Sequence, residues 1–83
     1  MRAEDILSDE QNQVERGGVV IRKGTVAAFM ANARVWCDPG ADVAQRQNAE
    51  RDILDALPGL HALGVFDVFS VKDAELRRFL ETH

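Results

Sequence analysis

The side chains that most often carry chemistry are few in this sequence and widely spaced. His61 is the only internal histidine, His83 is the last residue, and Cys37 is the only cysteine. A nucleophilic site needs a base within hydrogen-bond reach of the nucleophile and a third group that orients the base. No serine or cysteine lies near His61 in the sequence. We therefore predict that the chain is not an enzyme and has no catalytic residues.

Metal and phosphate sites are not indicated either. One cysteine and one internal histidine do not make a zinc ligand set. Lys23-Gly24-Thr25 is similar to part of a phosphate-binding loop. However, a P-loop places its lysine after the last glycine and directly before Ser or Thr. We expect no metal and no cofactor, and we interpret Thr25 as a helix N-cap. Cys37 follows Trp36 at the end of a predicted helix, and we expect it to be a buried core residue.

Length, charge and composition indicate one small domain spanning residues 1–83. The chain is 46% hydrophobic and carries a net charge of −4, which fits a globular protein with a thin core. No basic stripe is present, so nucleic acid is not an expected partner. The longest apolar run, Val26 to Ala31, is far shorter than the roughly 20 residues of a membrane span. With no secretory signal pattern and a single cysteine, we expect a cytoplasmic protein.

The elements that would position these residues are mainly helical. Apolar residues recur at helical spacing from Val26 to Trp36, which predicts a helix over 25–37 that ends at Asp38-Pro39-Gly40. A second helix is expected over 41–57, ended by Pro58-Gly59, with a short helix over 60–63 after it. The segment 65–69 reads as a hydrophobic loop. A capping signal that begins at Ser70 then predicts a terminal helix.

The N-terminal part of the chain allows two interpretations. Residues 2–16 have a weak helical pattern, whereas the residues on either side of Gly17-Gly18 have the β-branched character and the turn length of a hairpin. We expect a loosely packed helix over 1–13 and a short β-hairpin near residues 14–22. The predicted fold is therefore mainly α, a small bundle of three to four helices with a possible β-hairpin.

The predicted core combines the apolar faces of these helices. Its members are Val26, Phe29, Met30, Ala33, Trp36, Ile53, Leu54, Leu57, Leu60, Leu63, Phe66, Leu76, Phe79 and Leu80.

Apolar side chains in excess of so small a core indicate an interaction surface. The candidate interaction residues are Trp36, Val65, Phe66, Val68 and Phe69, since exposed aromatic clusters often dominate protein interfaces. We predict a non-catalytic module that binds a protein partner or associates with itself as a small homo-oligomer. The alternative is a DNA-binding helix-turn-helix built from 25–37 and 41–57, although the acidic residues of its second helix oppose phosphate contact.

Two stretches carry a family resemblance. Lys23-Gly24-Thr25-Val26 with the helix after it, and the segment from Leu57-Pro58 to Ser70, resemble a family of small uncharacterised bacterial proteins. The resemblance covers roughly residues 18–70. It implies a bacterial source and a stand-alone domain, and it carries over no functional residue.

Overall fold

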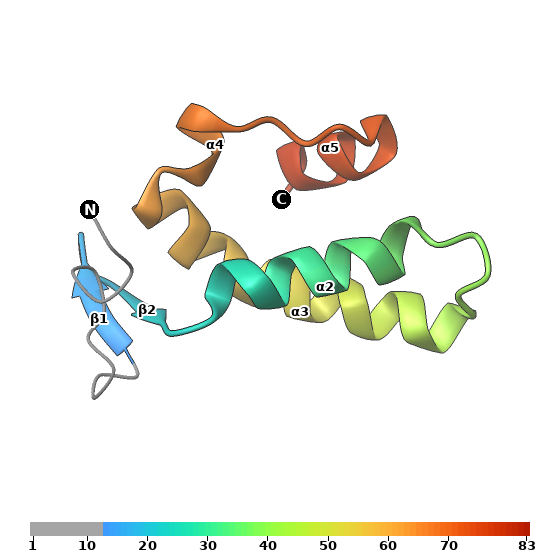
Figure 1. The fold of residues 1–83 in the computed structure, drawn as a ribbon, viewed down its shortest axis with the longest axis horizontal. Helices are drawn as coiled ribbons and strands as arrows, with labels where there is room; N and C mark the ends of the chain where they lie inside the picture. Colours follow the sequence, from blue (N-terminus) through green and yellow to red (C-terminus); the bar gives the residue numbers. More distant parts are fainter. Residues whose placement is uncertain (1–12) are drawn as a thin grey trace.

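The computed structural model describes residues 13–83. Its elements are β1 (Gln13–Arg16), β2 (Val19–Arg22), α2 (Thr25–Cys37), α3 (Val43–Leu63), α4 (Val65–Val68) and α5 (Ala74–Glu81). Figure 1 shows α2 and α3 as an antiparallel pair, with the hairpin at one end and α5 lying over the other half of α2. The predicted mainly α bundle with a short β-hairpin is confirmed. The predicted helix over 1–13 lies almost entirely outside the described residues.

The hairpin follows from its two central glycines. β1 and β2 pair antiparallel, with Val14 opposite Ile21. Gly17 and Gly18 both have positive φ, 59° and 80°, as the first and second central residues of a type I′ turn require. Ile21 is only 3% exposed, because β2 packs against α3. The hairpin thus adds a core residue that the helical patterns did not predict.

Helix α2 has the predicted bounds but a different N-terminal cap. Gly24 is the N-cap residue, in a left-handed conformation and without a side-chain cap. The Thr25 hydroxyl donates to the Arg22 carbonyl at 2.6 Å, so the prediction that Thr25 caps the helix was wrong. Its hydrogen bond instead closes the turn between β2 and α2.

Helix α3 is longer than predicted, because it continues through Pro58 to Leu63. Proline removes one backbone hydrogen bond from a helix interior, but Leu57, Gly59 and Leu60 are all buried around it. The burial on both sides of Pro58 offsets the missing bond. The predicted helix end at Pro58-Gly59 was therefore wrong. The helix begins with a capping box formed by Asp42 and Gln45.

The core lies where α3 meets α2 and α5. Its buried members are Phe29, Trp36, Ala49, Ile53, Leu57, Leu60 and Leu76, and Ala33, Leu54, Phe66, Phe79 and Leu80 pack against them. Val26 and Met30 were expected in this core, but they are 39% and 52% exposed. The reason is that α5 reaches only the C-terminal half of α2 (Figure 1). There the centroids of the Phe79 and Trp36 rings lie 5.5 Å apart.

Two glycines near the end of α3 give opposite predictions for replacement by alanine. A Cβ on Gly59 would meet Thr25 Cγ2 at 3.6 Å, an ordinary contact, so Gly59→Ala should stabilise the domain by about 0.5–1 kcal/mol. Gly64 has a φ of 76°, and its Cβ would lie 3.3 Å from Asp67 Oδ2. We expect Gly64→Ala to destabilise by about 1–2 kcal/mol. Urea unfolding of both variants measures the two signs, and two changes of the same sign would contradict this account.

Candidate interaction surface

The candidate surface begins at Gly64, where the chain turns from α3 into α4. The Gly64 amide donates to the His61 carbonyl at 3.0 Å, and the left-handed backbone at Gly64 ends α3. The segment that was predicted as a hydrophobic loop is therefore a one-turn helix, Val65–Val68. Its short turn divides the apolar residues of the segment between the core and the surface.

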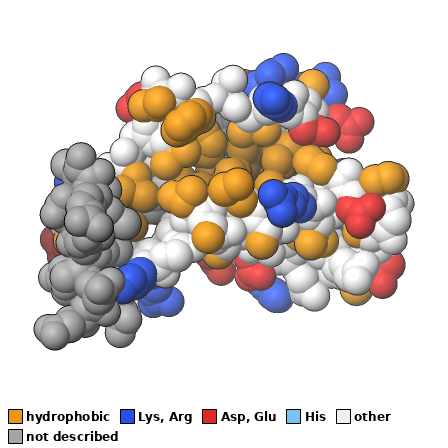
Figure 2. All heavy atoms as spheres, viewed as in Figure 1, with side chains coloured by type: hydrophobic (Ala, Val, Ile, Leu, Met, Phe, Trp, Pro, Cys, Tyr) orange, Lys and Arg blue, Asp and Glu red, His pale blue; other side chains and the backbone are white. Residues whose placement is uncertain are grey.

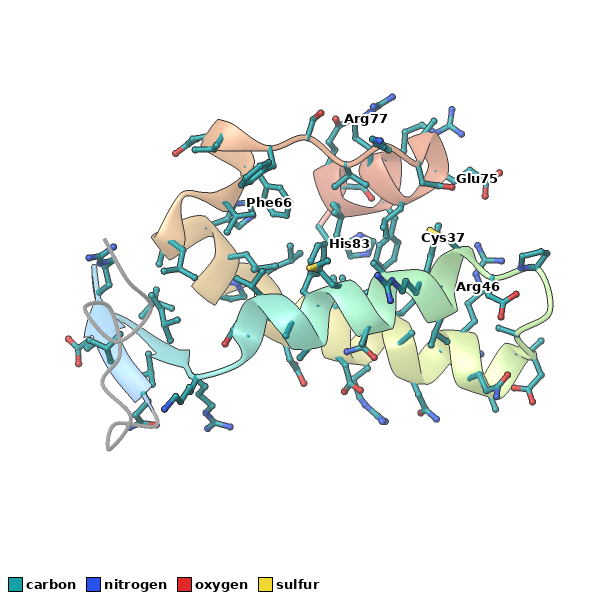
Figure 3. All side chains as sticks on the ribbon, viewed as in Figure 1. Cys37, Arg46, Phe66, Glu75, Arg77 and His83 are labelled. Carbon is teal, nitrogen blue, oxygen red and sulfur yellow. The ribbon has the colours of Figure 1, made fainter. Side chains whose placement is uncertain are left out.

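Phe66 anchors α4 to the rest of the domain. Its ring packs edge-to-face on Phe29 of α2, with centroids 5.9 Å apart and planes at 76°. The His61 ring contacts it from α3 at 5.6 Å. Figure 3 shows Phe66 pointing from α4 toward the interior. Val65 is likewise half-buried against the core. These two candidate residues hold the surface segment against the core and contribute little to its exposed area.

Val68 and Phe69 are the exposed members of the candidate set. Their exposed fractions are 75% and 69%, among the highest of the large hydrophobic residues. The Phe69 amide donates to the Val65 carbonyl at 2.9 Å, so the backbone at Phe69 is held although its ring is not covered. In Figure 2 the hydrophobic side chains form a broad area between α2 and the segment that contains α4 and α5.

Beside Phe69 lies a groove between α4 and α5, which we call the α4–α5 groove. Its volume is about 240 Å³, and it is lined by His61, Phe66, Phe69, Ser70, Val71, Arg77, Leu80 and Glu81. Arg77 Nη1 donates to the Val71 carbonyl at 3.1 Å, which ties α5 to the segment that follows α4. Arg77 and Glu81 contribute opposite charges to the groove, one helical turn apart on α5.

The structure places Trp36 in the core and not on this surface. Trp36 is 7% exposed, and its Nε1 donates to Glu50 Oε1 at 3.0 Å. The Arg46 guanidinium lies 4.3 Å from its ring centroid, and Phe79 covers it from α5. Trp36 thus holds α2, α3 and α5 together. A partner that binds at Phe69 would not touch it directly.

Cys37 is exposed, so the prediction of a buried core cysteine was wrong. Helix α2 ends at Cys37. Figure 3 shows the Cys37 side chain beside the beginning of α5. Partial burial raises the pKa of the Cys37 thiol, and the nearby Asp73 carboxylate raises it further through its charge and a hydrogen bond. The thiolate fraction at neutral pH is therefore reduced.

This arrangement predicts slow alkylation of Cys37 that depends on Asp73. Asp73→Asn removes the charge that raises the Cys37 pKa, while a side-chain oxygen remains to accept from the Leu76 amide at the start of α5. We expect iodoacetamide to react faster with Asp73→Asn than with the wild type at pH 8, and the rate curve to shift to lower pH. An unchanged curve would show that the carboxylate does not act on the thiol.

A second hollow lies between three elements: the hairpin, the start of α2, and the second half of α3. It has a volume of about 610 Å³ and is lined by Val20, Arg22, Lys23, Gly24, Thr25, Ala28, Asp52, Asp55, Ala56 and Gly59. Basic residues lie on the hairpin side and acidic residues on α3. Among residues 13–83 no group of three or more His, Cys, Asp or Glu side chains is placed to hold a metal ion.

The helix-turn-helix alternative finds no support in the geometry. A DNA-binding helix-turn-helix crosses its two helices at about 90–120°, whereas α2 and α3 lie side by side and antiparallel (Figure 1). Arg46, a basic residue of the second helix of this motif, is stacked over Trp36. Asn48 and Asp52 contact Arg51 along the same helix.

No described helix is long and apolar enough to cross a membrane. Comparison of the chain with protein-family models, with curated proteins and with solved structures gave no match.

Proposed function

We propose that this chain is a non-catalytic interaction domain that binds another polypeptide through α4 and the α4–α5 groove. The observation that carries the proposal is the exposure of Val68 and Phe69 beside the α4–α5 groove. Aromatic side chains next to a preformed hollow are typical of the central residues of protein interfaces. The proposal includes a bacterial, cytoplasmic setting, which rests on the sequence alone.

The anchoring of Phe66 supports this proposal. Phe29 and His61 both contact the Phe66 ring, so this residue, which lines the groove, is held in place. The left-handed backbone at Gly64 sets the direction of α4, which carries Val68 and is followed by Phe69. A surface that is already ordered loses less conformational entropy when it binds. The backbone that carries Val68 and Phe69 is therefore already ordered before a partner binds.

A matched pair of exposed valines provides the test. Val68 lies at α4, while Val43 lies at the start of α3 with a similar exposed fraction, 72% against 75%. A photo-cross-linking amino acid would replace either one in the full chain, expressed in its source cells. We expect discrete adducts with a polypeptide from position 68 and none from position 43. Adducts from neither position, or equal adducts from both, would overturn the proposal.

A further inference from the structure

We infer that the partner of the α4–α5 groove is a second copy of this chain, bound about a two-fold axis with Phe69 of each copy in the groove of the other. The inference rests on the proposed function and names its partner. It is supported by the shape, the charge pattern and the size of the groove.

Protruding and hollow parts lie side by side within this one patch. Two copies related by a two-fold axis present the same patch to each other, so every protruding group must find its hollow within that patch. Phe69 is 69% exposed and also lines the groove, so the protrusion and the hollow are neighbours. The groove volume of about 240 Å³ is below the roughly 300–1,000 Å³ of ligand pockets. It suits one or two side chains from another polypeptide.

Arg77 and Glu81 give the groove one positive and one negative charge. Both residues line the groove, and they lie four residues apart on α5, on the same side of the helix. Figure 3 shows Arg77 at the edge of α5 nearest the segment that follows α4. A two-fold axis between these residues places Arg77 of each copy against Glu81 of the other. An acidic or a basic partner would match one of the two charges and oppose the other.

The size of the apolar surface sets the expected affinity of the dimer. A standard interface buries about 800 Å² on each partner, which is more than so small a groove supplies alone. Figure 2 shows further hydrophobic side chains between α2 and the segment that contains α4 and α5, so the apolar surface extends beyond the groove. We therefore expect a dimer with a dissociation constant on the order of micromolar.

The test exchanges the two charges. In Arg77→Glu, both contacts across the axis become Glu against Glu, and in Glu81→Arg they become Arg against Arg. Each variant alone should therefore dimerise about tenfold or more weakly than the wild type, because facing like charges oppose association. An equal mixture of the two variants should recover the dimer, since every contact then joins Arg to Glu. The double variant Arg77→Glu/Glu81→Arg should recover it too.

Sedimentation velocity over a concentration series measures these constants, and circular dichroism checks that each variant is folded. Glu81 is exposed near the helix end, so Glu81→Arg is the variant least able to disturb the fold. A wild-type dimer that the single variants leave unchanged, or a mixture that stays monomeric, would overturn the inference. A wild type that is monomeric throughout would overturn it as well. If position 68 still forms adducts with a different protein, the proposed function stands without this inference, whereas adducts from neither position end both.

Discussion

Replacement of Ile53 by alanine is expected to remove a large part of the free energy of unfolding of this domain. Ile53 is 0% exposed and lies at the centre of the α2, α3 and α5 contacts. Truncation of a buried isoleucine costs about 2–5 kcal/mol, because the lost burial adds to the cost of the cavity. A domain of this size has a total stability of about 5 kcal/mol. Thermal unfolding followed by circular dichroism should show a large fall in midpoint.

Two milder variants control for this effect. Ile53→Val removes one methylene from the same site and should cost about 0.5–1.5 kcal/mol. Val43→Ala trims a side chain that is 72% exposed and should leave the midpoint nearly unchanged. If Ile53→Ala were as stable as Val43→Ala, the core described here would be wrong.

The second large effect is expected at Trp36, and it is an effect on stability. Trp36→Ala removes the ring that contacts Phe79 and lies under Arg46, and it leaves Glu50 without the Nε1 donor. Loss of a buried tryptophan costs about 3–5 kcal/mol. We expect urea unfolding of Trp36→Ala to show little or no folded baseline. Trp36→Phe keeps much of the packing, loses the hydrogen bond, and should remain folded with a smaller loss.

This pair of variants separates a core residue from an interface residue. If Trp36 were a direct contact for a partner, Trp36→Ala would unfold at the wild-type urea concentration and only its association would be weakened. That result would contradict the structure, in which the tryptophan lies between three helices. A strong loss of stability in Trp36→Ala, with folded Trp36→Phe still able to associate, is the expected outcome.

The parts of the fold that the sequence predicts well are those set by local signals. The hairpin depends on Gly17-Gly18 and on the β-branched residues after them, all within ten residues of one another. The bounds of α2 depend on an apolar stripe and on the break at Asp38-Pro39-Gly40. In each case the backbone preference and the burial pattern agree, so one short stretch of sequence is enough.

The errors arise where distant segments decide the outcome. Pro58 is a helix breaker by its own chemistry, but burial of Leu57 and Leu60 by other elements carries α3 through it. Met30 belongs to the same apolar stripe as Phe29, yet it stays exposed because α5 covers only the other end of α2. Ala49 is 2% exposed, although the first half of its helix reads as solvated. Helical periodicity cannot show which part of an apolar stripe is buried by another element of the fold.

The interaction surface itself stays a prediction, but the structure shows how the side chains of its segment are divided. The hydrophobic segment 65–69 stands out in the sequence, and the structure exposes Val68 and Phe69 while it turns Val65 and Phe66 inward. The roles of Arg77 and Glu81 were not predicted. They reach the surface only because α5 folds back beside α4 and the Arg77 side chain binds the Val71 carbonyl. The four-residue spacing of Arg77 and Glu81 was the available signal in the sequence. It does not show which other segment these two charges face.

The most direct test of the interaction surface compares Val68→Asp with Val43→Asp. Both changes place a carboxylate at a valine of similar exposure, at opposite ends of the molecule. The dissociation constant for the partner, a second copy in our inference, would be measured for both variants and the wild type. We expect Val68→Asp to weaken binding by about tenfold or more, because a charge in an apolar interface loses its hydration, and Val43→Asp to bind like the wild type. Equal affinities for the two variants would contradict the account.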